Sequence, residues 1–89
     1  MQMAKIEIYT QMGCGYCARA LQLLQSKNID FEQIDVSLNS DLRAEMAKRA
    51  GGRNTSPQIF VNDEHIGDSD EIFALERTGH LDKLLKVGS

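Results

Sequence analysis

The length and composition of the sequence point to one small globular domain. Its 89 residues are 42 % hydrophobic and 26 % charged, which excludes disordered and collagen-like proteins, so we expect residues 1–89 to form a single domain with one core. The formal net charge is −3 and no run of Lys or Arg occurs, so we expect no nucleic acid and no membrane among the partners.

The first half of the chain predicts strands and helices in alternation. Ile6 and Ile8 alternate with charged neighbours, which is typical of a strand. Apolar residues then recur at helical spacing in two longer segments, the second of which ends at Gly51-Gly52. The predicted elements are, in chain order, a strand over 5–10, a helix over 18–28, a strand over 30–37 and a helix over 40–52.

The second half of the chain predicts a hairpin over 57–67 and helices over 69–79 and 80–87. The two short apolar runs of the hairpin are joined by Asn62-Asp63, a pair that tolerates left-handed turn conformations. Ser69 is a suitable N-cap for the helix that follows. A strand–helix–strand unit implies a right-handed parallel crossover, and the hairpin adds an antiparallel pair. We therefore predict an α/β fold with a four-stranded mixed sheet flanked by helices.

The expected cellular compartment bears on how the two cysteines are interpreted. The first ten residues contain no apolar leader segment, and no apolar run in the sequence is long enough to span a bilayer. We therefore expect a cytoplasmic protein in a reducing environment. Cysteines there are more often catalytic or metal-binding than structural.

Cys14 and Cys17, the two cysteines of the chain, lie three positions apart in the segment GCGYC. As a disulfide they would close a loop of about four residues, which stabilises a fold by only ~2 kcal/mol, against ~3 kcal/mol for fifteen residues. A zinc site would need two further ligands, and the separation of His65 and His80 does not fit the short spacing of zinc motifs. Redox chemistry is the interpretation that remains.

The position of the pair assigns different roles to the two thiols. Cys14 falls where the first strand passes into the first helix, so free N–H groups and the helix dipole favour its thiolate. Cys17 lies one turn inside the helix and is shielded. We therefore predict Cys14 as nucleophile and Cys17 as resolving thiol. A stabilised thiolate is also a good leaving group, which suits a site that takes up and releases a small thiol.

Three segments of the sequence, YTQMGCGYC, TSPQIFVN and HIGDSDEIFALERTG, resemble the glutaredoxin family in order and spacing across nearly the whole chain. The resemblance implies a thioredoxin-like fold and a dithiol glutaredoxin with a Cys-Gly-Tyr-Cys active site. It also implies glutathione-dependent thiol–disulfide exchange, in which the first cysteine attacks a glutathione mixed disulfide or a protein disulfide. The partners implied are glutathione, disulfide or glutathionylated proteins, and the glutathione reductase system.

The resemblance also assigns residues to glutathione binding. It implies that Pro57 forms a cis bond facing the active site and turns the backbone of Ser56 toward the substrate, although an ordinary proline at a strand start also suits the position. Tyr16 would line the glutathione groove. Arg53 could meet the glycyl carboxylate, with a solvated arginine as the alternative. Gln11 stands where the family commonly has Lys, and it keeps hydrogen bonding without the charge.

The segment Gly67-Asp68-Ser69-Asp70 opens a predicted helix. Backbone N–H groups of Ser69 and Asp70 can hold a carboxylate there, and the resemblance implies that the γ-glutamyl end of glutathione binds, with its amino group paired to Asp70. Ser69 or Asp68 can also serve as the N-cap. The family usually has Gly in place of Asp68, and a non-Gly residue at positive φ costs on the order of 1 kcal/mol. Because Gln11 and Asp68 make the site less positive, we expect weaker glutathione binding.

Gly15, where redox motifs of this spacing often have proline, leaves a second function open. Members of the family with this glycine can hold a two-iron two-sulfur cluster between two protomers, with two glutathiones as further ligands. Cys14 would be the metal ligand in such a dimer, because proline restricts the loop and Gly15 relaxes it. Otherwise we expect a monomer. A third alternative, suggested by Gln11 and Asp68, is an electron donor recharged by thioredoxin reductase.

Overall fold

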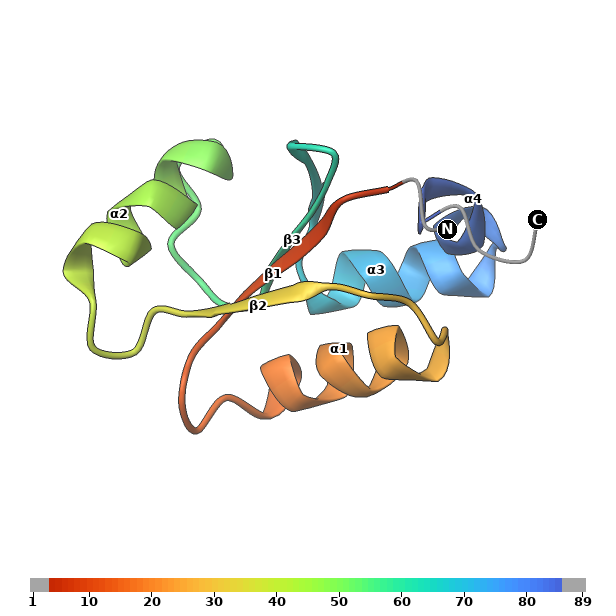
Figure 1. The fold of residues 1–89 in the computed structure, drawn as a ribbon, viewed down its shortest axis with the longest axis horizontal. Coiled ribbons are helices and arrows are strands. Elements are labelled where there is room, and N and C mark those ends of the chain that lie inside the picture. The colour runs from red at the N-terminus through yellow and green to blue at the C-terminus, as the bar shows by residue number, and fades with distance from the viewer. Residues whose placement is uncertain (1–3, 86–89) are drawn as a thin grey trace.

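A computed structural model describes residues 4–85 and shows a sheet with helices on both faces (Figure 1). The elements are β1 (Ile6–Thr10), α1 (Gly15–Ser26), β2 (Glu32–Asp35), α2 (Ser40–Arg49), β3 (Gln58–Val61), β4 (Glu64–Gly67), α3 (Ser69–Arg77) and α4 (His80–Leu85). Each predicted element is present, and the last two residues of the predicted final helix lie outside the described range. Among residues 4–85, no helix has the length and apolar character that a membrane span needs.

The four strands form one mixed sheet in the order β2-β1-β3-β4, as predicted. β1 is parallel to β2 and antiparallel to β3, and β3 is antiparallel to β4. Tyr9 of β1 lies opposite Gln58 of β3 in this register. The end of β1, which leads into the cysteine motif, therefore lies beside the start of β3, which follows Pro57.

Two apolar clusters fill the two faces of the sheet. α1, α3 and α4 contribute to the cluster that contains Ile8 and Ile59, whereas α2 covers the face that contains Tyr9 and Phe60. Figure 1 shows α1 and α3 on one side of the sheet and α2 on the other. Because helices cover both faces, all five residues of β1 are buried. The alternation of apolar and charged residues in this strand does not mark a solvent-facing side.

Glu7 is the charged residue that this double coverage buries, and it is only 6 % exposed. Arg49 of α2 binds it, with 2.8 Å between Nη2 and Oε1, and donates a second hydrogen bond to the hydroxyl of Tyr9 at 2.7 Å. The guanidinium also lies 4.1 Å from the ring centroid of Phe60. The hydrogen bond from Arg49 holds the pKa of the Glu7 carboxyl below its usual range. α2 is therefore fastened to the sheet by a charge pair as well as by its apolar stripe.

The turn between β3 and β4 confirms the predicted role of Asn62-Asp63. Both residues have positive φ, 52° and 68°, as a tight hairpin turn with two left-handed residues requires. Asn62 is also tied to β1, since its Oδ1 accepts a hydrogen bond from the N–H of Lys5 at 2.8 Å. The turn is thus tied to the residue that precedes β1.

We predict that Arg49→Ala lowers the free energy of unfolding by about 2–3 kcal/mol, because it leaves the buried carboxylate of Glu7 without its partner. Chemical denaturation at neutral pH measures the change. Lys48→Ala is the matched control, since Lys48 is an exposed residue of the same helix and its loss should change stability little. Equal losses in the two variants would contradict the role assigned to Arg49.

Candidate active site

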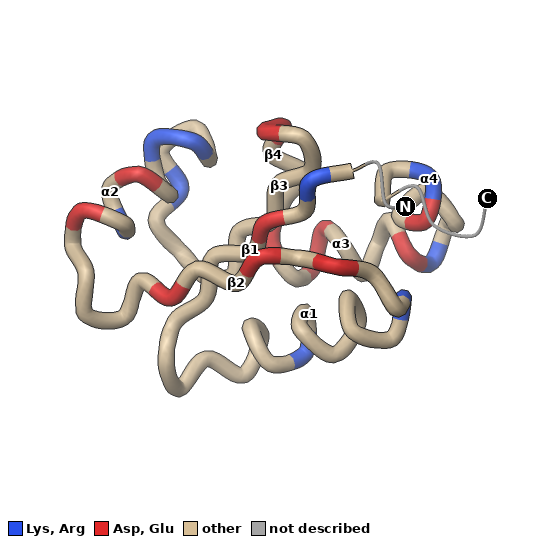
Figure 2. The backbone as a smooth tube through the Cα atoms, in the orientation of Figure 1, with Lys and Arg blue, Asp and Glu red and all other residues tan. Residues whose placement is uncertain are grey.

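Cys14 is the N-cap residue of α1, which places its sulfur at the start of the helix. Its Sγ accepts a hydrogen bond from the N–H of Cys17 at 3.1 Å. The first turn of α1 contains no acidic residue, and Figure 2 shows none along the helix. An anionic sulfur at this position therefore gains from the helix dipole and meets no negative charge on its own helix.

The two thiols, both free, differ in exposure as predicted. Cys14 is partly exposed, whereas Cys17 is only 3 % exposed. Burial, together with its hydrogen bond to Cys14, raises the pKa of the Cys17 thiol to about 12. Cys17 is therefore a neutral thiol at physiological pH while Cys14 is the thiol that solvent and substrates reach.

The loop before β3 faces Cys14. The Ser56–Pro57 peptide bond is cis, as the sequence resemblance implied. The thiol of Cys14 donates a hydrogen bond to the carbonyl oxygen of Ser56, with 3.6 Å between sulfur and oxygen. The hydroxyl oxygen of Ser56 is buried and has no hydrogen-bond partner within residues 4–85. The backbone of Ser56 therefore lies against the sulfur of Cys14.

Gln58 and His65, which the sequence analysis did not assign to the site, hold this loop in place. Gln58 is fully buried in β3, and its Nε2 donates hydrogen bonds to the carbonyl and hydroxyl oxygens of Thr55 at 3.0 and 3.2 Å. Its Oε1 lies 2.6 Å from Nε2 of His65. Burial lowers the pKa of the His65 imidazole. The available signal was a glutamine in an otherwise apolar strand, directly after the single proline.

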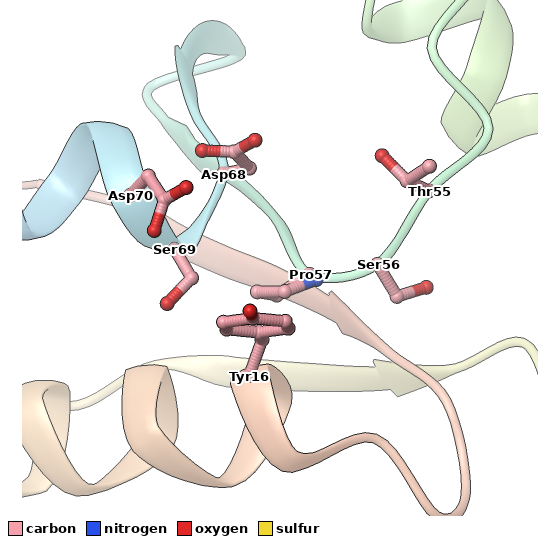
Figure 3. Close-up of a pocket in the computed structure, with 7 residues that line it drawn as sticks. All are labelled: Tyr16, Thr55, Ser56, Pro57, Asp68, Ser69 and Asp70. Atoms are coloured by element: carbon pink, nitrogen blue, oxygen red, sulfur yellow. The ribbon is translucent and has the colours of Figure 1, made fainter.

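A pocket of about 360 Å³ opens beside the loop (Figure 3). Its described lining consists of Tyr16, Thr55, Ser56, Pro57, Asp68, Ser69 and Asp70. The ring of Tyr16 lies next to Pro57, and the start of α3 forms the opposite wall (Figure 3). Five of the residues predicted to bind glutathione thus meet in one cavity: Tyr16, Ser56, Pro57, Ser69 and Asp70.

The other three predicted binding residues lie elsewhere. Gln11 lines a second hollow of about 460 Å³, together with Cys14, Cys17 and Asp35. Arg53 does not line the first pocket. It forms ion pairs with Asp68 and Glu71, each at 2.7 Å. Gly67 is also outside that lining.

Asp68, rather than Ser69, is the N-cap of α3. Its Oδ1 accepts a hydrogen bond from the N–H of Glu71 at 3.1 Å, and Oε1 of Glu71 accepts one from the N–H of Asp68 at 3.0 Å. This reciprocal pair is a capping box. Ser69 is instead the first helical residue and is buried. The N–H groups of Ser69 and Asp70 belong to the first helical turn, where backbone amides can bind an anion.

The positive φ considered for Asp68 occurs one residue earlier, at Gly67. Asp68 has φ of −101°, so its backbone carries no left-handed cost. Gly67 has φ of 128°, and a Cβ there would lie 2.6 Å from Cβ of Glu71. Only glycine therefore fits beside the capping box, which gives Gly67 a structural role.

The chain matches known proteins along most of its length. The glutaredoxin family model matches residues 6–66. Glutaredoxin 3 of Escherichia coli is 49 % identical over 84 residues, covering 94 % of this chain and all of that protein. The solution structure of a glutaredoxin from Brucella melitensis is 50 % identical, with a TM-score of 0.84 and coverage of 100 % of this chain and 96 % of that one.

A more distant structure, the buckwheat glutaredoxin–glutathione complex, has the same fold. It is 26 % identical, with a TM-score of 0.83 and coverage of 93 % of this chain and 77 % of that one. The fold is therefore thioredoxin-like, and the Cys14–Cys17 pair at a helix start fits the dithiol active site of the family. The family match, the close relatives and the Cys14–Cys17 pair lead to one conclusion: the chain belongs to the glutaredoxin family, whose members are thiol–disulfide oxidoreductases.

Proposed function

We propose that the protein uses glutathione to reduce glutathione mixed disulfides and protein disulfides. The observation that carries this proposal is the position of Cys14. Its sulfur lies at the N-terminus of α1 and 3.6 Å from the Ser56 carbonyl oxygen, beside a pocket whose walls bear both carboxylates and free helix amides. A zwitterionic γ-glutamyl group fits that chemistry, because its carboxylate suits the amides of Ser69 and Asp70 and its ammonium suits the Asp70 side chain.

Reduction of a glutathione mixed disulfide takes two exchanges. The Cys14 thiolate attacks the glutathione sulfur, a Cys14–glutathione bond forms, and the protein thiolate leaves and takes a proton from water. The thiolate of a second glutathione then attacks the bound glutathione sulfur and expels the Cys14 thiolate. The glutathione disulfide that leaves joins the glutathione taken from the substrate to the second glutathione, whose thiol is the one consumed as the protein thiol forms. The glutathione reductase system of the cytoplasm would reduce that product.

A protein disulfide requires Cys17. Cys14 attacks one sulfur of the substrate and forms a mixed disulfide with it, releasing the first substrate thiol. Cys17, deprotonated by solvent as it reacts, attacks Cys14 and releases the second substrate thiol, which leaves a Cys14–Cys17 disulfide for glutathione to reduce. The pKa of Cys17, raised to about 12, keeps it protonated until this step, so it does not compete with Cys14 for the first attack.

Binding of a two-iron two-sulfur cluster is the second candidate function. Gly15 carries the proposal, because glycine leaves the backbone beside the partly exposed Cys14 free where proline would restrict it, and the space around Gly15 is open to a second chain. Within residues 4–85, no group of three or more His, Cys, Asp or Glu side chains could hold a metal ion. A cluster bound at Cys14 would therefore take its remaining ligands from glutathione and from a second copy of the chain.

Replacement of each cysteine tests the roles of the two thiols. Cys14→Ser should lower glutathione-coupled reduction of a mixed disulfide by about 10³-fold or more, because the attacking sulfur is lost. Cys17→Ser should retain this activity and lose reduction of protein disulfides. Turnover coupled to glutathione reductase measures both activities, and wild-type rates in Cys14→Ser would rule out the mechanism.

The same assay with thioredoxin reductase in place of glutathione and its reductase tests the electron source. Turnover with thioredoxin reductase alone would favour that enzyme as the source.

Alkylation tests the predicted difference between the thiols. At pH 7, iodoacetamide should modify Cys14 and leave Cys17 intact on the same timescale, because Cys17 is buried and its pKa is raised to about 12. Mass spectrometry of peptides locates the label, and the same reaction in guanidinium chloride should label both residues. Comparable labelling of both cysteines in the folded protein would contradict the assignment.

Gly15→Pro separates the two candidate functions. Gly15 is the first residue of α1, where proline is favoured, so the variant should fold and reduce disulfides at wild-type rates. Any cluster formed on anaerobic reconstitution with glutathione should be lost, because the loop is now restricted. Visible absorbance and size-exclusion chromatography detect the cluster and its dimer. A wild-type protein that stays colourless and monomeric would remove the cluster function.

A further inference from the structure

The wall of the pocket formed by the start of α3 is acidic. Asp68 and Asp70 both line the cavity, and none of its seven described lining residues is basic. Figure 3 shows the side chains of Asp68 and Asp70 on this wall, across from Ser56 and the ring of Tyr16. A ligand that enters with a net negative charge therefore meets like charge on one side.

Arg53 forms ion pairs with this wall and does not itself line the cavity. Its Nη2 binds Oδ2 of Asp68 and its Nη1 binds Oε1 of Glu71, both at 2.7 Å. The same Glu71 oxygen accepts the N–H of Asp68, and Oδ1 of Asp68 accepts the N–H of Glu71. Arg53 is thus part of a closed network with the helix cap, and both ends of its guanidinium are occupied by carboxylates.

We propose that Asp68 is a charge-selectivity residue, which weakens binding of anionic thiol substrates by keeping Arg53 on the outer side of the cap and adding a negative charge to the pocket wall. This inference rests on the proposed function. Asp68 touches no reacting atom, so it acts on substrate affinity and leaves the exchange steps at Cys14 unchanged. The effect is electrostatic and is screened by salt.

Asp68→Asn isolates the charge from the structural role of the residue. Asn is as good an N-cap as Asp, so its side-chain oxygen can still accept the N–H of Glu71. The substitution removes the carboxylate from the pocket wall and one of the two partners of Arg53. The far-UV circular dichroism spectrum should match that of the wild type. The thermal midpoint should fall by no more than the loss of one surface ion pair explains.

Two substrates that differ only by an ethyl ester, and therefore in charge, provide the test. One is a mixed disulfide of glutathione with a neutral peptide, in which the glutathione part carries one net negative charge at pH 7. The other carries the glycyl monoethyl ester of glutathione, which is neutral overall. For Asp68→Asn at low salt, kcat/KM for the glutathione substrate should rise roughly two- to fivefold, because KM falls while kcat stays nearly the same. The kcat/KM for the ester substrate should barely change.

Two further measurements sharpen the test. The gain should vanish at high salt, and Arg53→Gln in the Asp68→Asn background should reduce it, because a guanidinium that has lost one of its two carboxylate partners supplies part of the attraction. Glu32→Gln removes an equal charge from the exposed edge strand β2 and is the matched control, with no change expected for either substrate.

An unchanged KM in Asp68→Asn, or an equal change for both substrates, would overturn the proposal and leave Asp68 with its capping role alone. A failure of the proposed function looks different. In that case neither the wild-type protein nor Asp68→Asn would turn over either glutathione-derived substrate.

Discussion

The reactive centre depends on the contact between the start of α1 and the cis Ser56–Pro57 loop. Antiparallel pairing of β1 with β3, with Tyr9 opposite Gln58, brings these two segments together from positions more than forty residues apart. Cys14 then has a backbone donor on one side, the N–H of Cys17, and the backbone of Ser56 on the other. Cys14 therefore contacts one lining residue of the first pocket, Ser56, and itself lines the second hollow.

Charge is divided between the two sides of this centre. α1 carries no acidic residue, so the sulfur at its start lies at the positive end of the helix dipole with no acidic side chain on its own helix. The start of α3, which forms one wall of the first pocket, carries Asp70 and Glu71 in its first turn and Asp68 as its cap. The proposed nucleophile therefore has no acidic residue on its own helix, whereas the start of α3 bears three carboxylates.

Much of the fold was predictable because the responsible interactions are local in sequence. Helical spacing, the Asn62-Asp63 turn and the position of Cys14 before a helix each depend on a few neighbouring residues, and the structure has all three. The cis bond at Pro57 followed from the family resemblance, since the residues alone also suited a trans proline.

The interactions that could not be predicted join distant segments through side chains. Arg49 pairs with Glu7 across the sheet, and Gln58 links His65 to Thr55. The place of Arg53 depends on Asp68 and Glu71, which lie fifteen or more positions later in the chain. The N-cap of α3 was open between Ser69 and Asp68 because both can accept an N–H, and the Glu71 capping box decides for Asp68.

The central claim is that glutathione attached to Cys14 lies in the cavity between Tyr16 and the start of α3. NMR spectra of the Cys17→Ser variant, compared before and after formation of its mixed disulfide with glutathione, test it most directly. The account predicts the largest shift changes at the amides of Ser56, Ser69 and Asp70, with intermolecular contacts to the ring of Tyr16. Changes confined to the second hollow, around Gln11 and Asp35, would contradict it.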